Sequence, residues 1–179
     1  MKRDVRIVEI EKDATLPVVK YRYVSDSYYD VSIAHGVGSW IVELGLKPFA
    51  ESFEKVFEEK FFEKHVEEPR VFAVETKGKR VGWLELGYDS WNNRMRVWDI
   101  SVEENWRRKD IGALLMNQAV KVAKKRGARM LVLETQSCNV PAINFYLKFG
   151  FELIGFDAAA YSNKDVERKE VRLEFGLKL

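Results

Sequence analysis

Three basic residues stand at the predicted start of a long helix: Arg107, Arg108 and Lys109. They are followed by Asp110 and then by apolar residues that recur at helical spacing as far as Gly127. The first turn of a helix presents unpaired backbone N–H groups and a partial positive charge, and together these bind anions. The loop therefore predicts a pyrophosphate site, although an exposed basic loop without any ligand has the same composition.

The segments around this loop predict how it is held in place. Residues 71–76, 80–88 and 94–102 are rich in Val, Trp and Leu, and short turns with Gly or Asn separate them, which predicts an antiparallel meander. After the helix come a buried strand, a short helix from Pro141 to Phe149 and two further strands over 151–161 and 169–179. The pattern predicts an α+β fold: a mixed, mostly antiparallel central sheet flanked by helices.

The N-terminal region is more varied. Residues 5–10 alternate like a strand, and residues 21–33 are aromatic and β-branched enough for extended structure. After Pro48, apolar residues recur at helical spacing with Glu and Lys between them: Phe49, Phe53, Val56, Phe57 and Phe61. This spacing predicts a helix that ends before Pro69.

Composition excludes several classes of protein. The chain has 179 residues, enough for one domain, and its 30 basic and 28 acidic residues are well mixed, which argues against a nucleic-acid partner. No apolar run approaches the ~20 residues of a membrane span, and the first residues lack the apolar stretch of a secretory signal. A single cysteine, Cys138, fits a reducing compartment, and the two histidines lack metal-ligand spacing. We expect a cytoplasmic protein without a metal or a membrane partner.

Two blocks of sequence resemble the GNAT family of acetyl-CoA-dependent N-acetyltransferases. The first is a valine at a strand end followed by an aromatic-Arg-x-x-Gly-x-Gly/Ala loop and a helix, matched by Val102, Trp106, Arg107, Asp110 and Gly112. The second is Asn-x-x-Ala-x-x-Phe-Tyr-x-x-x-Gly-Phe, matched by Asn139, Ala142, Phe145, Tyr146, Gly150 and Phe151. The resemblance implies one GNAT-like domain over residues 1–179, with a variable strand and helix region over 1–70 and a cofactor-binding core over 71–179.

The chain departs from the family loop at one position, because Asp110 stands where the family has its first glycine. Aspartate tolerates left-handed backbone geometry better than most residues. Its carboxylate would repel phosphates if it pointed inward, so we expect it to face solvent or to pair with Arg107 or Lys109.

The resemblance also implies how the residues would divide the work. Acetyl-CoA would contact these residues: Ile100, Ser101, Val102, Arg107, Arg108, Lys109, Asp110, Ile111, Gly112, Ala113, Asn139, Ala142 and Tyr146. A free amine with a pKa near ~10 must lose a proton before it attacks a thioester, so a carboxylate or a water that it orders must help. Glu85 and Asp99 are the candidates, Glu85 being the better, and each could equally be a solvent-facing strand residue. Tyr146 would protonate the departing thiolate.

Within the family, one segment points to a narrower group. Leu133–Asn163 resembles the LETQ-x-x-NVPA region of the streptothricin acetyltransferases, which implies that the acceptor is the β-lysine amine of streptothricin. A cationic acceptor needs acidic and aromatic walls, which these residues could supply: Tyr28, Tyr29, Glu85, Asp89 and Trp91. Two alternatives stay open, an acetyltransferase for protein or peptide N-termini and a non-catalytic acetyl-CoA-binding module. A homodimer is consistent with the resemblance.

Overall fold

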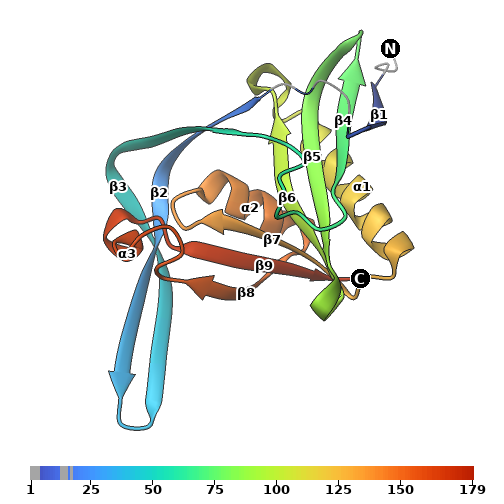
Figure 1. Cartoon of the computed structure of the whole chain (residues 1–179). Coiled ribbons are helices and arrows are strands. Elements are labelled where there is room, and N and C mark those ends of the chain that lie inside the picture. The colour runs from blue at the N-terminus through green and yellow to red at the C-terminus, as the bar shows by residue number, and fades with distance from the viewer. Residues whose placement is uncertain (1–4, 13–15, 17) are drawn as a thin grey trace. The chain divides into compact units, whose positions relative to one another are not determined.

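The computed structural model, drawn in Figure 1, describes residues 5–12, 16 and 18–179. Its contacts divide the chain into two compact units. Unit 1 consists of residues 1–20, 58–133 and 176–179, and unit 2 consists of residues 21–57 and 134–175. Both units draw on residues from either side of residue 70. Four strands pass from one unit into the other along the chain: β2 (Val19–Gly36), β3 (Ser39–Glu59), β7 (Met130–Gln136) and β9 (Arg172–Lys178).

Unit 1 is built on a sheet with the strand order β1-β4-β5-β6-β7. The remaining elements of this unit are β1 (Val5–Ile10), β4 (Arg70–Thr76), β5 (Lys79–Asp89), η1 (Ser90–Asn92), β6 (Arg94–Val102), η2 (Glu104–Trp106) and α1 (Ile111–Arg126). Neighbouring strands from β1 to β6 run antiparallel, and β6 runs parallel to β7. The predicted meander is therefore confirmed, as is the mostly antiparallel character of the sheet.

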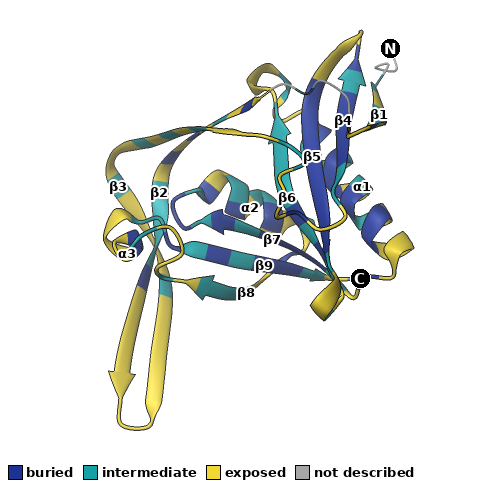
Figure 2. Cartoon of the chain, viewed as in Figure 1, coloured by how far each residue is buried: buried dark blue, intermediate teal, exposed yellow. Residues whose placement is uncertain are grey.

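The core of unit 1 lies between this sheet and α1. The side chains that are at most 2% exposed include Val71, Phe72, Leu84, Leu86, Leu115, Met116 and Leu131. Figure 2 shows β4 and β5 as almost continuously buried. The helix α1 ends at Gly127, whose φ of 77° is the left-handed conformation that favours glycine at this position, as the sequence predicted.

Unit 2 contains the strand order β7-β9-β8, where β8 is Glu152–Asp157, together with α2 (Val140–Phe149) and α3 (Asp165–Arg168). Pro141 stands in the first turn of α2, where a proline is well tolerated because its missing N–H would have no helical partner. The short helix α3 was not predicted. Its Asp165 is buried and accepts hydrogen bonds from the Tyr161 N–H at 2.8 Å and the Ser162 hydroxyl at 2.7 Å.

The strands β2 and β3 form a long two-stranded hairpin, so the helix predicted over 49–61 is wrong. Phe49, Phe53 and Phe57 are four residues apart, and a separation of four returns a side chain to the same face of a strand as well as of a helix. The rings of β3 pack on tyrosines of β2: Phe49 lies 4.6 Å from Tyr28 and Phe57 lies 5.0 Å from Tyr21, between ring centroids. Cross-strand aromatic pairs of this kind stabilise extended structure.

The tip of the hairpin has a different character from its base. Residues 32–43 are all exposed, and Figure 2 shows the tip without buried residues. The rings of His35 and Trp40 pack across the two strands, tilted by 47° with 4.4 Å between their centroids, and therefore lie on one face of the hairpin. Strand alternation places further apolar residues on that face. Ile33 is 45% exposed, Val42 39% and Leu46 57%.

No helix of the described residues is long and apolar enough to span a membrane.

Candidate active site

Glu85 lies in the interior of unit 1, where β5 pairs with β6. Its side chain is only 1% exposed, and the residue stands opposite Asp99 in the antiparallel register. The next aligned pair is Leu86 with Val97, so Trp98 is an extra residue in β6 and forms a β-bulge. A bulge redirects side chains beside it. The structure thus brings the two predicted general-base candidates together on adjacent strands.

A segment that follows β3 contacts this part of the sheet. Phe61 packs its ring on Trp83, with 5.4 Å between the centroids. Phe62 has a φ of 60°, which is unusual for a bulky residue, and its backbone N–H donates a hydrogen bond of 2.6 Å to Oε1 of Glu85. Phe62 thus adopts an unusual backbone conformation at the point where its N–H holds the Glu85 carboxylate.

Burial raises the pKa of Glu85 from an ordinary 4.5 to about 7. The hydrogen bond from Phe62 lowers it, while the negative charges of Asp99, Glu63 and Glu59 raise it. A carboxylate with a pKa near 7 accepts a proton readily and is still ionised in about half of the molecules at pH 7, which are the properties a general base needs. Glu59 and Glu63 were not among the predicted site residues, and neither was Phe62.

The strand β6 extends beyond the stretch that pairs with β7. Pairing joins residues 94–97 to residues 130–133, and the predicted cofactor-binding residues Ile100, Ser101 and Val102 come after it. These three residues pair with β5 on one side. Oγ of Ser101 is buried and has no hydrogen-bond partner among the described residues. This part of β6 offers polar groups that a ligand could bind.

The basic loop before α1 has two residues with left-handed backbone geometry. Arg108 has a φ of 55° and Asp110 a φ of 65°, so Asp110 adopts the conformation for which the family uses glycine. The side chain of Asp110 is exposed and makes no capping bond to the helix, in agreement with the expectation that it faces solvent. The backbone N–H groups at the start of α1 are not occupied by this carboxylate.

Two basic side chains of the loop, those of Arg107 and Lys109, donate hydrogen bonds to nearby backbone carbonyls. Nε of Arg107 donates to the carbonyl of Val102 at 3.1 Å, and Nζ of Lys109 donates to the carbonyl of Asn105 at 2.6 Å. Lys109 also lies over the ring of Trp106, 5.1 Å from its centroid. These contacts place positive charge beside the helix start.

The second family block spans the whole of α2 in unit 2, from its N-cap Asn139 to Gly150 and Phe151 after its end. Asn139 is the N-cap residue, and its Oδ1 accepts a hydrogen bond of 3.4 Å from the N–H of Ala142. Tyr146 is 7% exposed, and its ring packs among Phe145, Phe151 and Phe175. The structure thus gives Asn139 a capping role in addition to the cofactor contact that the sequence predicted.

The predicted acceptor-binding residues of unit 1 are spread along β5 and η1. Asp89 is four residues beyond Glu85, or ~13 Å along a strand, and it pairs with Arg96 at 3.4 Å. Trp91 lies in η1 and is 85% exposed. Asp89 and Trp91 are therefore not gathered around Glu85 within this unit.

The other two predicted acceptor-binding residues, Tyr28 and Tyr29, lie on β2 in unit 2. The ring of Tyr28 packs on Phe49, and Nζ of Lys169 lies 5.2 Å from its centroid. The N–H of Tyr29 donates to the carbonyl of Ser137 at 2.9 Å. Both tyrosines thus have packing or backbone contacts of their own.

No group of three or more His, Cys, Asp or Glu residues in the described part of the chain is arranged to hold a metal ion.

The sequence profile of the acetyltransferase (GNAT) family matches residues 36–151, and the chain belongs to this family. The match includes Glu85, the basic loop and the whole of α2. It places the candidate site in a class of proteins that transfer acetyl groups from acetyl-CoA.

Individual proteins are also similar to this chain. A streptothricin acetyltransferase of Streptomyces lavendulae is 40% identical over 89 residues, which cover 50% of this chain and 47% of that protein. The chain thus spans about half the length of that relative. The crystal structure of nourseothricin acetyltransferase matches with a TM-score of 0.76 at 26% sequence identity. The match covers 97% of this chain and 98% of that chain.

The structure of a third similar protein was determined with a bound ligand. The crystal structure of a protein of Bacillus anthracis str. Ames, described as a streptothricin acetyltransferase in complex with acetyl coenzyme A, has a TM-score of 0.80. The two sequences are 24% identical, and the structural match covers 98% of this chain and 100% of the other chain. This similarity supports the fold alone.

Proposed function

We propose that this protein transfers the acetyl group of acetyl-CoA directly to a primary amine of a small cationic acceptor. The observation that carries the proposal is Glu85, a buried carboxylate with a pKa of about 7, held by the Phe62 N–H and surrounded by negative charge. Such a site attracts a protonated amine and can accept its proton. Family membership supplies the donor, acetyl-CoA.

The proposed donor site combines backbone groups with positive charge. The pyrophosphate binds the N–H groups at the start of α1, over Ile111, Gly112 and Ala113, next to Arg107–Lys109. The exposed position of Asp110 supports this assignment, because the carboxylate does not occupy those N–H groups. The pantetheine chain pairs with Ile100–Val102 and contacts Asn139 and Ala142.

In the proposed reaction each residue moves one proton. Glu85, assisted by Asp99 or by a water between them, takes a proton from the ammonium group of the acceptor. The free amine attacks the thioester carbonyl, the C–N bond forms, and the C–S bond breaks. Tyr146 gives its phenolic proton to the departing thiolate, so that coenzyme A leaves as a thiol, and the second proton that the nitrogen loses as the amide forms restores the phenol of Tyr146. No acyl-enzyme is formed.

For the acceptor we propose streptothricin, acetylated on its β-lysine amine. The support is the similarity to proteins named as streptothricin acetyltransferases and to nourseothricin acetyltransferase, together with the matching Leu133–Asn163 segment. Aromatic and acidic side chains from Tyr28, Tyr29, Asp89 and Trp91 would contact the rest of the molecule. Acetylation of the amine removes its positive charge, the expected basis of antibiotic resistance.

The test has two steps. Calorimetric titration with acetyl-CoA should give micromolar binding; the absence of binding would refute the pyrophosphate site. Purified protein is then incubated with acetyl-CoA and either streptothricin or a peptide with a free N-terminus, and release of coenzyme A is measured with a thiol reagent. Turnover with streptothricin supports the proposal. Turnover with the peptide alone would identify an N-terminal acetyltransferase, and binding without any turnover a non-catalytic module.

A further inference from the structure

The turn between β7 and α2 is held by contacts from several segments of unit 2. The Ser137 N–H donates to the carbonyl of Val171 at 2.8 Å, and the Ser137 hydroxyl donates to the carbonyl of Lys169 at 2.8 Å. From the hairpin side, the Tyr29 N–H donates to the carbonyl of Ser137 at 2.9 Å. The turn ends in Asn139, the residue that caps α2 and that the proposed function assigns to the donor.

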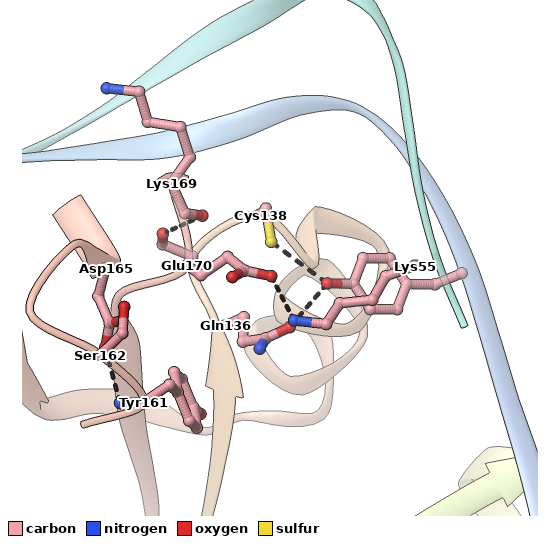
Figure 3. A network of polar contacts seen from close by, with 10 residues as sticks. Lys55, Gln136, Cys138, Tyr161, Ser162, Asp165, Lys169 and Glu170 are labelled. Carbon is pink, nitrogen blue, oxygen red and sulfur yellow. Dashed lines mark hydrogen bonds and ion pairs between the residues drawn. The ribbon is translucent and has the colours of Figure 1, made fainter. Parts of the chain in front are cut away.

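A buried tyrosine of the hairpin adds side-chain contacts to Gln136 and Cys138, two residues labelled in Figure 3. Tyr23 on β2 is 9% exposed, and its hydroxyl lies 2.9 Å from Oε1 of Gln136 and 3.2 Å from Sγ of Cys138. A hydroxyl has one proton, and the Gln136 amide oxygen is an acceptor only. Tyr23 therefore donates to Gln136 and accepts from the thiol of Cys138. Because Cys138 is fully buried and burial raises its pKa, it stays protonated as this arrangement requires.

The hairpin also forms ion pairs with Lys169 and Glu170, which lie in the segment whose backbone holds Ser137. Lys55 on β3 forms an ion pair with Glu170, and Lys169 forms one with Asp30 at 3.0 Å. The ring of Tyr23 packs near Phe53, with 6.3 Å between centroids. The hydroxyl of Tyr23 thus reaches the turn from a rigid support, which is what a positioning group needs.

We propose that Tyr23 is a positioning residue for the donor site: its hydroxyl fixes Gln136 and Cys138 on either side of the turn and thereby sets the orientation of Asn139 and the first turn of α2. This inference rests on the proposed function, because it assumes that Asn139 contacts acetyl-CoA. Tyr23 does not touch the reacting atoms. Loss of its hydroxyl loosens the turn and thereby weakens the binding of acetyl-CoA.

The test replaces Tyr23 by Phe and uses Tyr88→Phe as the matched control. Tyr88 is also 9% exposed and also donates from its hydroxyl to a side-chain amide oxygen, that of Asn93, at 2.9 Å, but it lies in unit 1 at the far end of β5. Both variants lose a hydrogen bond from a hydroxyl to an amide oxygen, and Tyr23→Phe also loses the contact with Cys138, so its melting temperature should fall at least as far as that of Tyr88→Phe. We expect Tyr23→Phe alone to raise KM for acetyl-CoA and its Kd about five- to tenfold, with kcat changed less than twofold.

The outcomes are distinguishable. If the parent protein does not bind acetyl-CoA, the proposed function fails before the variants are compared. If the parent binds and Tyr23→Phe binds equally well, or if Tyr88→Phe shifts KM by the same factor, the positioning role is refuted. Gln136→Leu removes the same hydrogen bond from its acceptor side and should reproduce the rise in KM, so the test does not depend on a single variant folding.

Discussion

At the scale of single residues, Glu85 combines two properties that work against each other. Burial disfavours its charged form, yet the proposed reaction needs that form to accept a proton. The Phe62 N–H partly offsets the cost, while Asp99, Glu59 and Glu63 add to it. The resulting pKa of about 7 leaves the carboxylate ionised in a large share of molecules at neutral pH.

The rate of acetylation should follow the ionisation of Glu85. As pH falls through about 7, Glu85 takes up a proton and kcat/KM for the amine should fall roughly tenfold per pH unit. Glu85→Gln retains an oxygen for the Phe62 N–H but cannot accept a proton, so kcat should fall by about 10²–10³. Steady-state rates between pH 5.5 and 9 test this; a Gln variant with the parent rate would rule out Glu85 as the base.

The same residue should destabilise the folded protein at higher pH. The pKa of Glu85 is higher in the folded protein than in the unfolded chain. Its contribution to the free energy of unfolding is therefore fully present below pH 4.5 and is lost as pH rises through about 7. Glu85→Gln has no such loss, and above pH 7 it should be more stable than the parent by about 1–3 kcal/mol. Urea unfolding at pH 5 and pH 8 gives the comparison; an equal difference at both values would contradict the assigned pKa.

Tyr146 should affect turnover without affecting donor binding. Tyr146→Phe keeps the ring that packs on Phe151 and Phe175 but removes the proton donor. We expect kcat to fall about 10²-fold while the Kd for acetyl-CoA stays within a factor of two. Rates and calorimetry on the same preparation check this. A variant that turns over at the parent rate would exclude Tyr146 as the general acid.

At the scale of secondary-structure elements, the start of α1 carries its own test. Asp110→Gly removes a negative charge beside the proposed pyrophosphate site and places glycine at a φ of 65°, where it is least strained. The variant should bind acetyl-CoA several-fold more tightly, whereas Gly112→Asp, which adds a carboxylate in the first turn, should bind more weakly. Calorimetric titration measures both. Unchanged affinity in both variants would place the pyrophosphate elsewhere.

The sequence predicted correctly those elements whose apolar residues recur with either the strand period or the helix period, but not with both. The meander alternates with period two between clear turns, and α1 repeats every 3.6 residues between Ile111 and Gly127. The segment 49–61 was misassigned because phenylalanines spaced by four satisfy both periods. The strand is stabilised there by contacts with the tyrosines of β2, Tyr21 with Phe57 and Tyr28 with Phe49. These residues are 36 and 21 positions apart, so a local pattern cannot indicate the contacts.

The candidate site was predictable to a similar extent. Tyr146 could be proposed from the second family block, Glu85 from its place on a meander strand, and the left-handed geometry of Asp110 from the position it occupies. The contact of Phe62 with Glu85 could not, since it follows from a segment whose structure was misassigned and from a positive φ at a phenylalanine. The acidic run around Glu59 and Glu63 was the available signal, but its proximity to β5 depends on tertiary structure.

At the scale of the whole molecule, stability should be distributed unevenly. The sheet strands β4 and β5 are almost fully buried, whereas residues 32–43 of the hairpin are all exposed. An isolated two-stranded hairpin is marginally stable in water, and opening of the tip exposes little additional apolar surface. Amide hydrogens of the tip should exchange with solvent at least about a hundredfold faster than those of β5. Hydrogen exchange followed by mass spectrometry tests this, and equal protection would show that the tip is covered in solution.

The way the chain alternates between the two units bears on its synthesis. Unit 1 takes residues from the beginning, the middle and the last four positions of the sequence, and unit 2 takes the two stretches between them. On the ribosome, where residues emerge in order, the pairing of β4, β5 and β6 can form early, because these strands follow one another closely. The hairpin, by contrast, emerges before its partners Gln136, Cys138 and Glu170 exist, and its apolar tip is then accessible to chaperones for most of translation.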